Sequence, residues 1–158
     1  RPDAATLLEE AAAGARAGDP LLTPSEHLSP DRIVVASLEG EVLVVNAAWL
    51  LHAIRGGYAG GPFVGQNYAE TLERHAEGCP SIEPILDALR GVASGAGDEH
   101  RYPYVCGREP DGRPAWYTVH HAAETRGGRE VLVVTHRRVP REEIDAVADA
   151  GLEDAATC

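Results

Sequence analysis

Two groups of strand-like segments on either side of a helical stretch constrain the fold of this chain more than any other feature. Residues 32–38 and 41–46 are β-branched and apolar, and Glu39-Gly40 lies between them. A two-residue connection that contains glycine predicts a β-hairpin. Because the strands of a hairpin are antiparallel, this first group favours an antiparallel sheet.

The second group of strands begins near residue 99. The predicted strands are 99–106, 115–123 and 130–136, and they are joined by the turns Glu109-Pro110-Asp111-Gly112 and Arg126-Gly127-Gly128. Pro103 cannot donate a hydrogen bond within a sheet, so it predicts an edge strand or a bulge.

The stretch between the two groups has helical periodicity. Helices are predicted over residues 47–55 and 67–77, and Asn67 is placed to cap the second of them. Ser81 is placed to cap a third helix. Its apolar stripe is formed by Ile82, Ile85, Leu86, Leu89 and Val92.

Both ends of the chain add helical segments. An Ala/Leu-rich amphipathic helix is predicted over residues 4–15, a proline-containing linker over 19–31, and a last helix over 141–150. The fold class is therefore α+β, with a five-stranded antiparallel sheet and a block of short helices on one face. The predicted divisions are an N-terminal helix and linker (1–31), a central domain (32–139) and a C-terminal helix or connector (140–158).

Charge and composition exclude several classes of protein. The 158 residues contain 25 acidic and 14 basic side chains, all of the latter Arg, for a net charge of −11. Phosphate backbones attract clustered positive charge, so direct nucleic-acid binding is not expected. No apolar run reaches the ~18 residues that a membrane helix needs.

The start of the sequence and its cysteines bear on the cellular compartment and on processing of the chain. No signal peptide is visible, and Cys79, Cys106 and Cys158 form no closely spaced motif, which predicts reduced thiols and a cytoplasmic location. The sequence begins at Arg1 without a methionine. We therefore expect a processed chain or a piece of a longer one.

The order of the motifs over residues 32–139 resembles a PAS domain, the small sensor module of signalling proteins. The resemblance rests on the opening hairpin RIVVASLEGEVLVVNAAW, the helix start GQNYAETL, the helix IEPILDALRGV, the strand set HRYPYVCGREPDGRPAWYTVHH and the last strand REVLVVTHR. Within these segments the characteristic residues are Asn46 and Trp49, Gly65, Asn67 and Tyr68, and Trp116 and Tyr117.

The resemblance implies a regulatory domain without catalytic activity of its own. It implies a pocket between the helices and the sheet for a small molecule or a partner protein. It also implies terminal helices that pair two chains and gate an attached or partner output, of the two-component, phosphatase, cyclic-nucleotide or transcriptional kind.

Two positions depart from the pattern of the family. Flavin-adduct relatives have Cys where this chain has Tyr68, which excludes that photochemistry. The last strand ends in Thr135-His136-Arg137 in place of Asp-x-Thr, so the joint to the C-terminal helix differs.

Aromatic and histidine side chains near the helix–sheet boundary are the candidate pocket residues. The candidates are Trp49, His52, Tyr68, Leu72, His75, Tyr102, Tyr104, Tyr117 and Val119. Core packing is the alternative explanation for the aromatic set. The sequence leaves open which strand faces point inward.

Three alternatives for the site chemistry are weighed against a colourless ligand or none. Haem would use His75 or His52 as its axial ligand, and a flavin would bind without a cysteine adduct. An enzyme would pair Cys106 with a histidine such as His121. Zinc is not expected, because the neighbours His120 and His121 point to opposite faces of a strand.

Overall fold

The structure is a computed structural model that describes residues 20–55, 63–78, 83–96 and 99–149, together with Thr6 and Glu9. The elements are α2 (Pro24–His27), β1 (Arg32–Ala36), β2 (Val42–Val45), α3 (Ala47–Arg55), α4 (Tyr68–Gly78), α5 (Glu83–Ala93), β3 (Glu99–Arg108), β4 (Pro114–Arg126), β5 (Arg129–Arg138), the 3-10 turn η2 (Arg141–Glu143) and α6 (Ile144–Asp149). The helix predicted over 4–15 and the Ser81 cap lie outside the described residues, apart from Thr6 and Glu9, which are helical.

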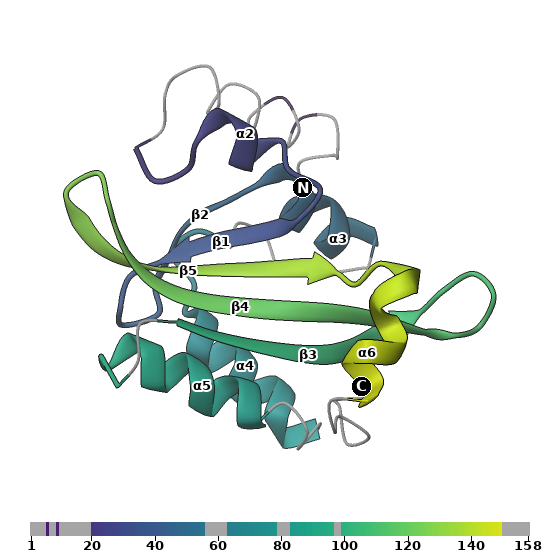
Figure 1. Ribbon diagram of the computed structural model, residues 1–158. Coiled ribbons are helices and arrows are strands. Elements are labelled where there is room, and N and C mark those ends of the chain that lie inside the picture. Colours follow the sequence, from purple (N-terminus) through teal and green to yellow (C-terminus); the bar gives the residue numbers. More distant parts are fainter. Residues whose placement is uncertain are drawn as a thin grey trace.

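The predicted antiparallel sheet is confirmed. Its five strands are in the order β2-β1-β5-β4-β3, as Figure 1 shows, and every pairing is antiparallel. β3 stands at an edge, and its Pro103 is opposite Thr118 on β4. The edge position expected from this proline is therefore correct, because a strand paired on one side leaves alternate N–H groups unused.

One face of the sheet packs against the helices and forms the main core. The residues of this core include Val34, Val119, Leu132 and Val134 from the sheet and Ile85, Leu86, Leu89 and Val92 from α5. In Figure 1, α4 and α5 lie beside each other along β3. The apolar stripe predicted for the third helix is thus the buried stripe of α5 wherever the helix is described.

The connection between β1 and β2 is longer than the predicted two-residue turn. It spans residues 37–41, because the Ser37 N–H donates to the Glu41 carbonyl at 2.8 Å and closes a wider loop. Gly40 has φ +95°, and a Cβ there would lie 2.9 Å from Asn67 Oδ1. Only glycine adopts this φ without strain and also leaves room for Asn67. The loop therefore packs closely against the residue that precedes α4.

The linker predicted over residues 19–31 is wrong in part, because residues 24–27 form the helix α2. Thr23 and Glu26 make a capping box, with each side chain accepting from the other's backbone N–H. Leu22 is 1% exposed. It packs on the second face of the sheet, against a cluster that comprises Ile33, Val35, Val131 and Val133.

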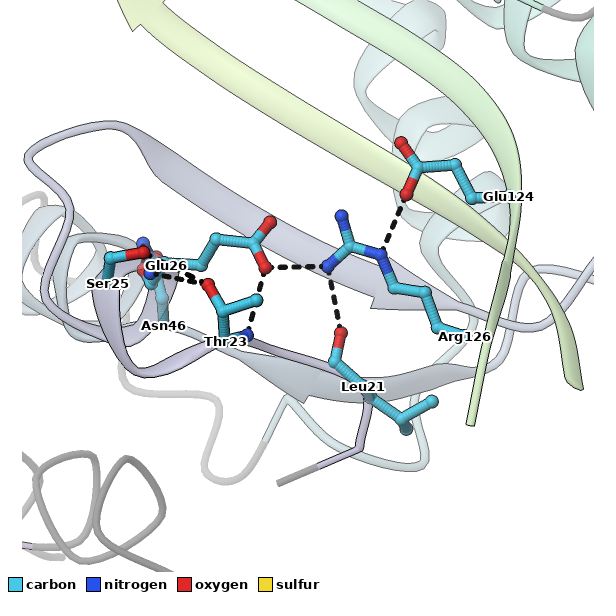
Figure 2. Close-up of polar contacts among 7 residues, drawn as sticks. All are labelled: Leu21, Thr23, Ser25, Glu26, Asn46, Glu124 and Arg126. Carbon is cyan, nitrogen blue, oxygen red and sulfur yellow. Dashed lines mark hydrogen bonds and ion pairs between the residues drawn. The ribbon is translucent and has the colours of Figure 1, made fainter. Parts of the chain in front are cut away.

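An arginine on the β4–β5 hairpin fastens this segment to the sheet (Figure 2). Arg126 Nη1 donates to Glu26 Oε1 at 2.9 Å and to the Leu21 carbonyl at 3.0 Å, while its Nε donates to Glu124 at 2.8 Å. Burial alone would raise the pKa of the Glu26 carboxyl, but the hydrogen bonds from Arg126 and Thr23 lower it below its usual value. Residues 20–31 are therefore an anchored part of the fold.

Asn46 joins three separate segments at one buried point. Its Oδ1 accepts from the N–H groups of Ile33 at 3.0 Å and Trp49 at 3.1 Å. Its Nδ2 donates to the carbonyls of Glu26 at 3.0 Å and Asp31 at 2.7 Å. One side chain thereby caps α3 and holds α2 and the approach to β1 against it.

We predict that Asn46→Ala lowers the free energy of unfolding by about 3 kcal/mol, since several buried backbone groups lose their partner. Asn67 is the matched control. It caps α4 by accepting from the Glu70 N–H at 3.0 Å, at a site open to water. Asn67→Ala should cost only about 1 kcal/mol. Urea unfolding of both variants checks this, and equal losses would contradict the special role of Asn46.

Candidate functional site

The strand register shows which side chains point toward the helices. Tyr104 is opposite Tyr117, and Tyr102 is opposite Val119. Because Val119 is in turn opposite His136 and both Val119 and Tyr104 belong to the main core, all five side chains share the face that the helices cover.

The neighbouring histidines His120 and His121 lie on opposite faces of β4, as the sequence predicts. His121 is opposite Val134 and is fully buried on the helical face, whereas His120 is opposite Thr135 on the other face. Two side chains so placed do not bind one ion together.

A chain of hydrogen bonds runs from Arg32 to Tyr68 through the buried ring of His136. Arg32 Nη2 donates to the Tyr104 hydroxyl at 2.8 Å, and that hydroxyl lies 2.6 Å from His136 Nδ1. His136 Nε2 lies 3.1 Å from the Tyr68 hydroxyl. Since a guanidinium only donates, the Tyr104 hydroxyl accepts from Arg32 and can still donate its own hydrogen to Nδ1. In the neutral tautomer with hydrogen on Nε2, His136 donates to the Tyr68 hydroxyl.

Burial keeps these groups uncharged. It lowers the pKa of His136 well below its usual value, and the nearby Arg32, His121 and His52 lower it further. Burial also raises the pKa of the Tyr68 hydroxyl. The imidazole and the phenol are therefore both neutral near pH 7, and the charge in this group resides on Arg32.

Trp49 completes the cluster from α3. Its ring centre lies 5.6 Å from that of His136 and 5.9 Å from that of Tyr68. The Nε1 of Trp49 is buried and has no hydrogen-bond partner in the part of the chain that the structure describes. An unpaired buried donor is costly, so this N–H is a group that an acceptor would stabilise.

A cavity of about 490 Å³ opens next to this cluster. It lies between α3, the start of β1, the start of β4 and the end of β5, and Figure 1 shows α3 beside the arrowhead of β5. Its lining residues are Leu28, Ser29, Pro30, Arg32, Ala47, Ala48, Leu51, His52, Arg55, Tyr117, His136 and Arg138. This volume is in the range of small-molecule sites, ~300–1,000 Å³.

Tyr117 forms one wall of the cavity and is held between two other side chains. Its ring stacks on Tyr104 with centres 5.6 Å apart, and the Arg32 guanidinium carbon lies 4.9 Å from its centre. His52 meets the same ring edge-on at 6.4 Å. Burial lowers the pKa of His52, and the positive charges of Arg32 and Arg55 lower it further.

The candidate residues named from the sequence fall into four groups. His52 and Tyr117 line the cavity, and Trp49, Tyr68 and Tyr104 surround His136. Leu72, Tyr102 and Val119 belong to the hydrophobic core and do not line this cavity. His75 lies in α4, but its side chain is outside the described residues.

Sequence reasoning missed Arg32 and His136. The two residues are directly opposite each other on β1 and β5, at the end of the sheet next to α3. Alternation along β5 puts His136 on the same face as Leu132 and Val134, which is the signal that identifies it. Without the register, nothing connects the start of the first strand with the end of the last.

The structure also shows where the residues named for the alternative chemistries lie. Cys106 lies where the pairing of β3 with β4 is irregular, between Val105 and Arg108, and its side chain is outside the described residues. His121 is fully buried. No group of three or more His, Cys, Asp or Glu side chains in the described ranges is arranged to hold a metal ion.

Solved structures with the same fold are found at low sequence identity. The PAS domain from Bordetella pertussis BvgS matches with a TM-score of 0.51 and 15% identity, over 82% of this chain and 92% of that one. The photoactive yellow protein domain of the sensor histidine kinase Ppr from Rhodospirillum centenum matches with a TM-score of 0.51 and 11% identity, over 78% and 98%. The fold of this chain is the PAS fold, as the motif order predicts.

No family model and no curated protein matches the chain by sequence. Among the helices that the structure describes, none is long and apolar enough to span a membrane.

We predict that His136 makes the fold sensitive to acid. Its pKa is depressed in the fold, so the unfolded chain takes up the proton first as pH falls below about 6.5. Stability that is complete above that pH is then lost by up to about 1.4 kcal/mol per pH unit, the limit for one proton. Urea unfolding at pH 7.5 and 5.5 measures the loss.

The variant His136→Gln keeps hydrogen-bonding groups next to Tyr104 and Tyr68 but has no proton to gain. Its stability should fall less than that of the native chain between the two pH values. Parallel declines in both proteins would show that His136 is not the group responsible.

Proposed function

We propose that this chain is a sensory domain that binds a small molecule in the cavity next to α3 and gates the output of an attached or partner signalling domain. The observation that carries the proposal is the composition of the cavity wall. Leu28, Ser29 and Pro30 follow α2 directly, and Arg138 is the last residue of β5. A ligand in the cavity would contact the segments that lead toward both ends of the chain.

This placement gives a physical route for a signal. A ligand shifts a conformational equilibrium only as far as it binds one state better than the other. Residues 28–30 connect to α2, and Arg138 is followed closely by η2 and α6. A ligand that prefers one position of these segments therefore changes how the terminal segments are held.

The likeness to known proteins supports a regulatory role. One of the two similar structures is a domain of a sensor histidine kinase, and outputs of the phosphatase, cyclic-nucleotide or transcriptional kind fit the same arrangement. Catalysis is not proposed. Ser29 lines the cavity, but its hydroxyl accepts from the Asp31 N–H and has no hydrogen-bonded base among the described residues.

The ligand that we propose is colourless, and the domain works in the cytoplasm. An absorption spectrum of the purified protein tests the first point, because haem and flavin absorb in the visible range. Bands between about 350 and 600 nm would replace the colourless ligand with a pigment. Binding of a partner protein in place of a small molecule is the second candidate.

A second part of the proposal is a homodimer formed through the terminal helices. The helix predicted over residues 4–15 carries an apolar stripe on which Leu7 and Leu8 are the largest side chains. A two-fold pairing of such stripes would bring two sensor domains under one control.

We predict that Ala48→Phe blocks ligand binding, because Ala48 lines the cavity and a phenyl ring would project into the space beside α3. A small-molecule library is screened by thermal shift against the native chain. A ligand at 100 times its Kd adds about 2.7 kcal/mol to the stability. That shift should disappear in Ala48→Phe.

The matched control is Val64→Phe, at a side chain that is 52% exposed and away from the cavity. It should keep the full thermal shift. Hydrogen exchange at residues 28–31 and 138–149 should slow when the ligand is bound. If a ligand raises the melting temperature of Ala48→Phe as much as that of the native chain, the binding site lies elsewhere.

We predict that Leu8→Asp converts the dimer to a monomer, because a carboxylate in an apolar seam must be desolvated without a partner. Sedimentation velocity of the full chain measures the change. A native chain that sediments as a monomer would contradict the dimer, as would a variant that remains paired.

A further inference from the structure

The cavity next to α3 is lined by positive charge from three different elements. Arg32 comes from β1, Arg55 from α3 and Arg138 from β5, and no acidic residue is among the described residues of the wall. The chain as a whole has 25 acidic residues and a net charge of −11. The charged side chains in the described wall of the cavity are therefore all cationic, although the chain as a whole is strongly acidic.

The three arginines differ in how far they are already neutralised. Arg138 forms an ion pair with Glu109. Arg32 has only the neutral Tyr104 hydroxyl and the Tyr117 ring as partners, and it makes no ion pair with the described residues. Arg55 is exposed at the end of α3. Arg32 and Arg55 thus keep a charge that is open to a ligand.

The electrostatics of His52 agree with a positive potential in the cavity. The depressed pKa of His52 is due to burial and to the positive charges of Arg32 and Arg55. Burial disfavours a charge of either sign at this point, whereas the two arginines disfavour a second cation and favour an anion.

A hollow elsewhere in the fold shows that this charge is local. The groove between α4 and α5 is lined mainly by carboxylates, from Glu73, Glu77, Glu83 and Asp87, with Arg90 as its cation. An anion would be repelled there. The two concave surfaces therefore select ligands of opposite charge.

Part of the remaining wall is apolar. Leu28, Pro30 and Leu51 line it together with the Tyr117 ring. Their surface is unsuited to a bare inorganic ion, and a cavity of about 490 Å³ has room for a larger body. An organic ligand would cover this surface and remove it from water.

From this arrangement we infer that the ligand is a small organic acid, with its carboxylate held by Arg32 and Arg55 and its apolar body against Leu51 and Tyr117. The inference rests on the proposed ligand-binding function and deepens it. The planar guanidinium groups present paired N–H donors that match a carboxylate. The wall of the cavity thus supplies both the charged and the apolar contacts that such a ligand needs.

Isothermal titration calorimetry with the full chain tests the inference. The probes are benzoate, the neutral isostere benzamide, succinate and inorganic phosphate, each up to about 10 mM, which detects millimolar affinity. Benzoate or succinate should bind at least about tenfold more tightly than benzamide, since a charge-assisted hydrogen bond contributes that much. Their affinity should also fall as salt is raised.

Three variants locate the interaction. Arg32→Gln and Arg55→Gln should each weaken carboxylate binding about tenfold. The Arg55 side chain makes no hydrogen bond or ion pair with the described residues, so its variant remains informative if Arg32→Gln fails to fold. Arg137→Gln is the matched control. It removes the same charge from the neighbour of Arg138, on an exposed side chain outside the cavity, and it should leave the affinity unchanged.

Each contrary result has a distinct meaning. Equal binding of benzamide and benzoate, or unchanged affinity in Arg55→Gln, overturns the organic-acid ligand while small-molecule binding stands. Phosphate that binds as tightly as the carboxylates overturns the choice of an organic acid. If no probe binds but the screen finds a neutral ligand whose thermal shift disappears in Ala48→Phe, only this inference fails. If that screen also finds nothing, the proposed function fails with it.

Discussion

The arrangement of this fold depends on one amide side chain that has no exposure to solvent. Asn46 is 0% exposed and uses both lone pairs of Oδ1 and both hydrogens of Nδ2. Those four bonds fix the approach to β1, the start of α3 and the end of α2 relative to one another. The cavity lies between these same segments. Its shape is therefore set by a group that does not touch its contents.

Sequence reasoning succeeds where a local rule governs the outcome. Pro103 predicts an edge strand because a missing N–H is a property of one residue, and the apolar stripe of α5 follows from helical spacing alone. It fails for α2, where Leu22 and Arg126 bring together residues about a hundred positions apart. The contact has no local signal, although the capping-box spacing of Thr23 and Glu26 around Pro24 does mark the start of a helix.

The candidate site shows the same division. Aromatic residues such as Tyr104 and Tyr117 are recognisable because aromatic side chains make up only 5% of this chain. Arg32 and His136 become part of the site only through the strand register, which pairs them across β1 and β5. The aromatic residues of the site can therefore be identified from the sequence. The charged residues that would select a ligand are brought together by strand pairing, which no single segment encodes.

Neither edge of the sheet is suited to accept a further strand. At β3 the proline interrupts the row of donors. At β2 the backbone of residues 65–66 already bonds to Val42, and Asn67 forms a bridge to Glu41. Assembly by strand addition, the common route to fibrous aggregates, is thus obstructed on both sides. A sheet built in this way does not recruit other copies of the chain through its edges.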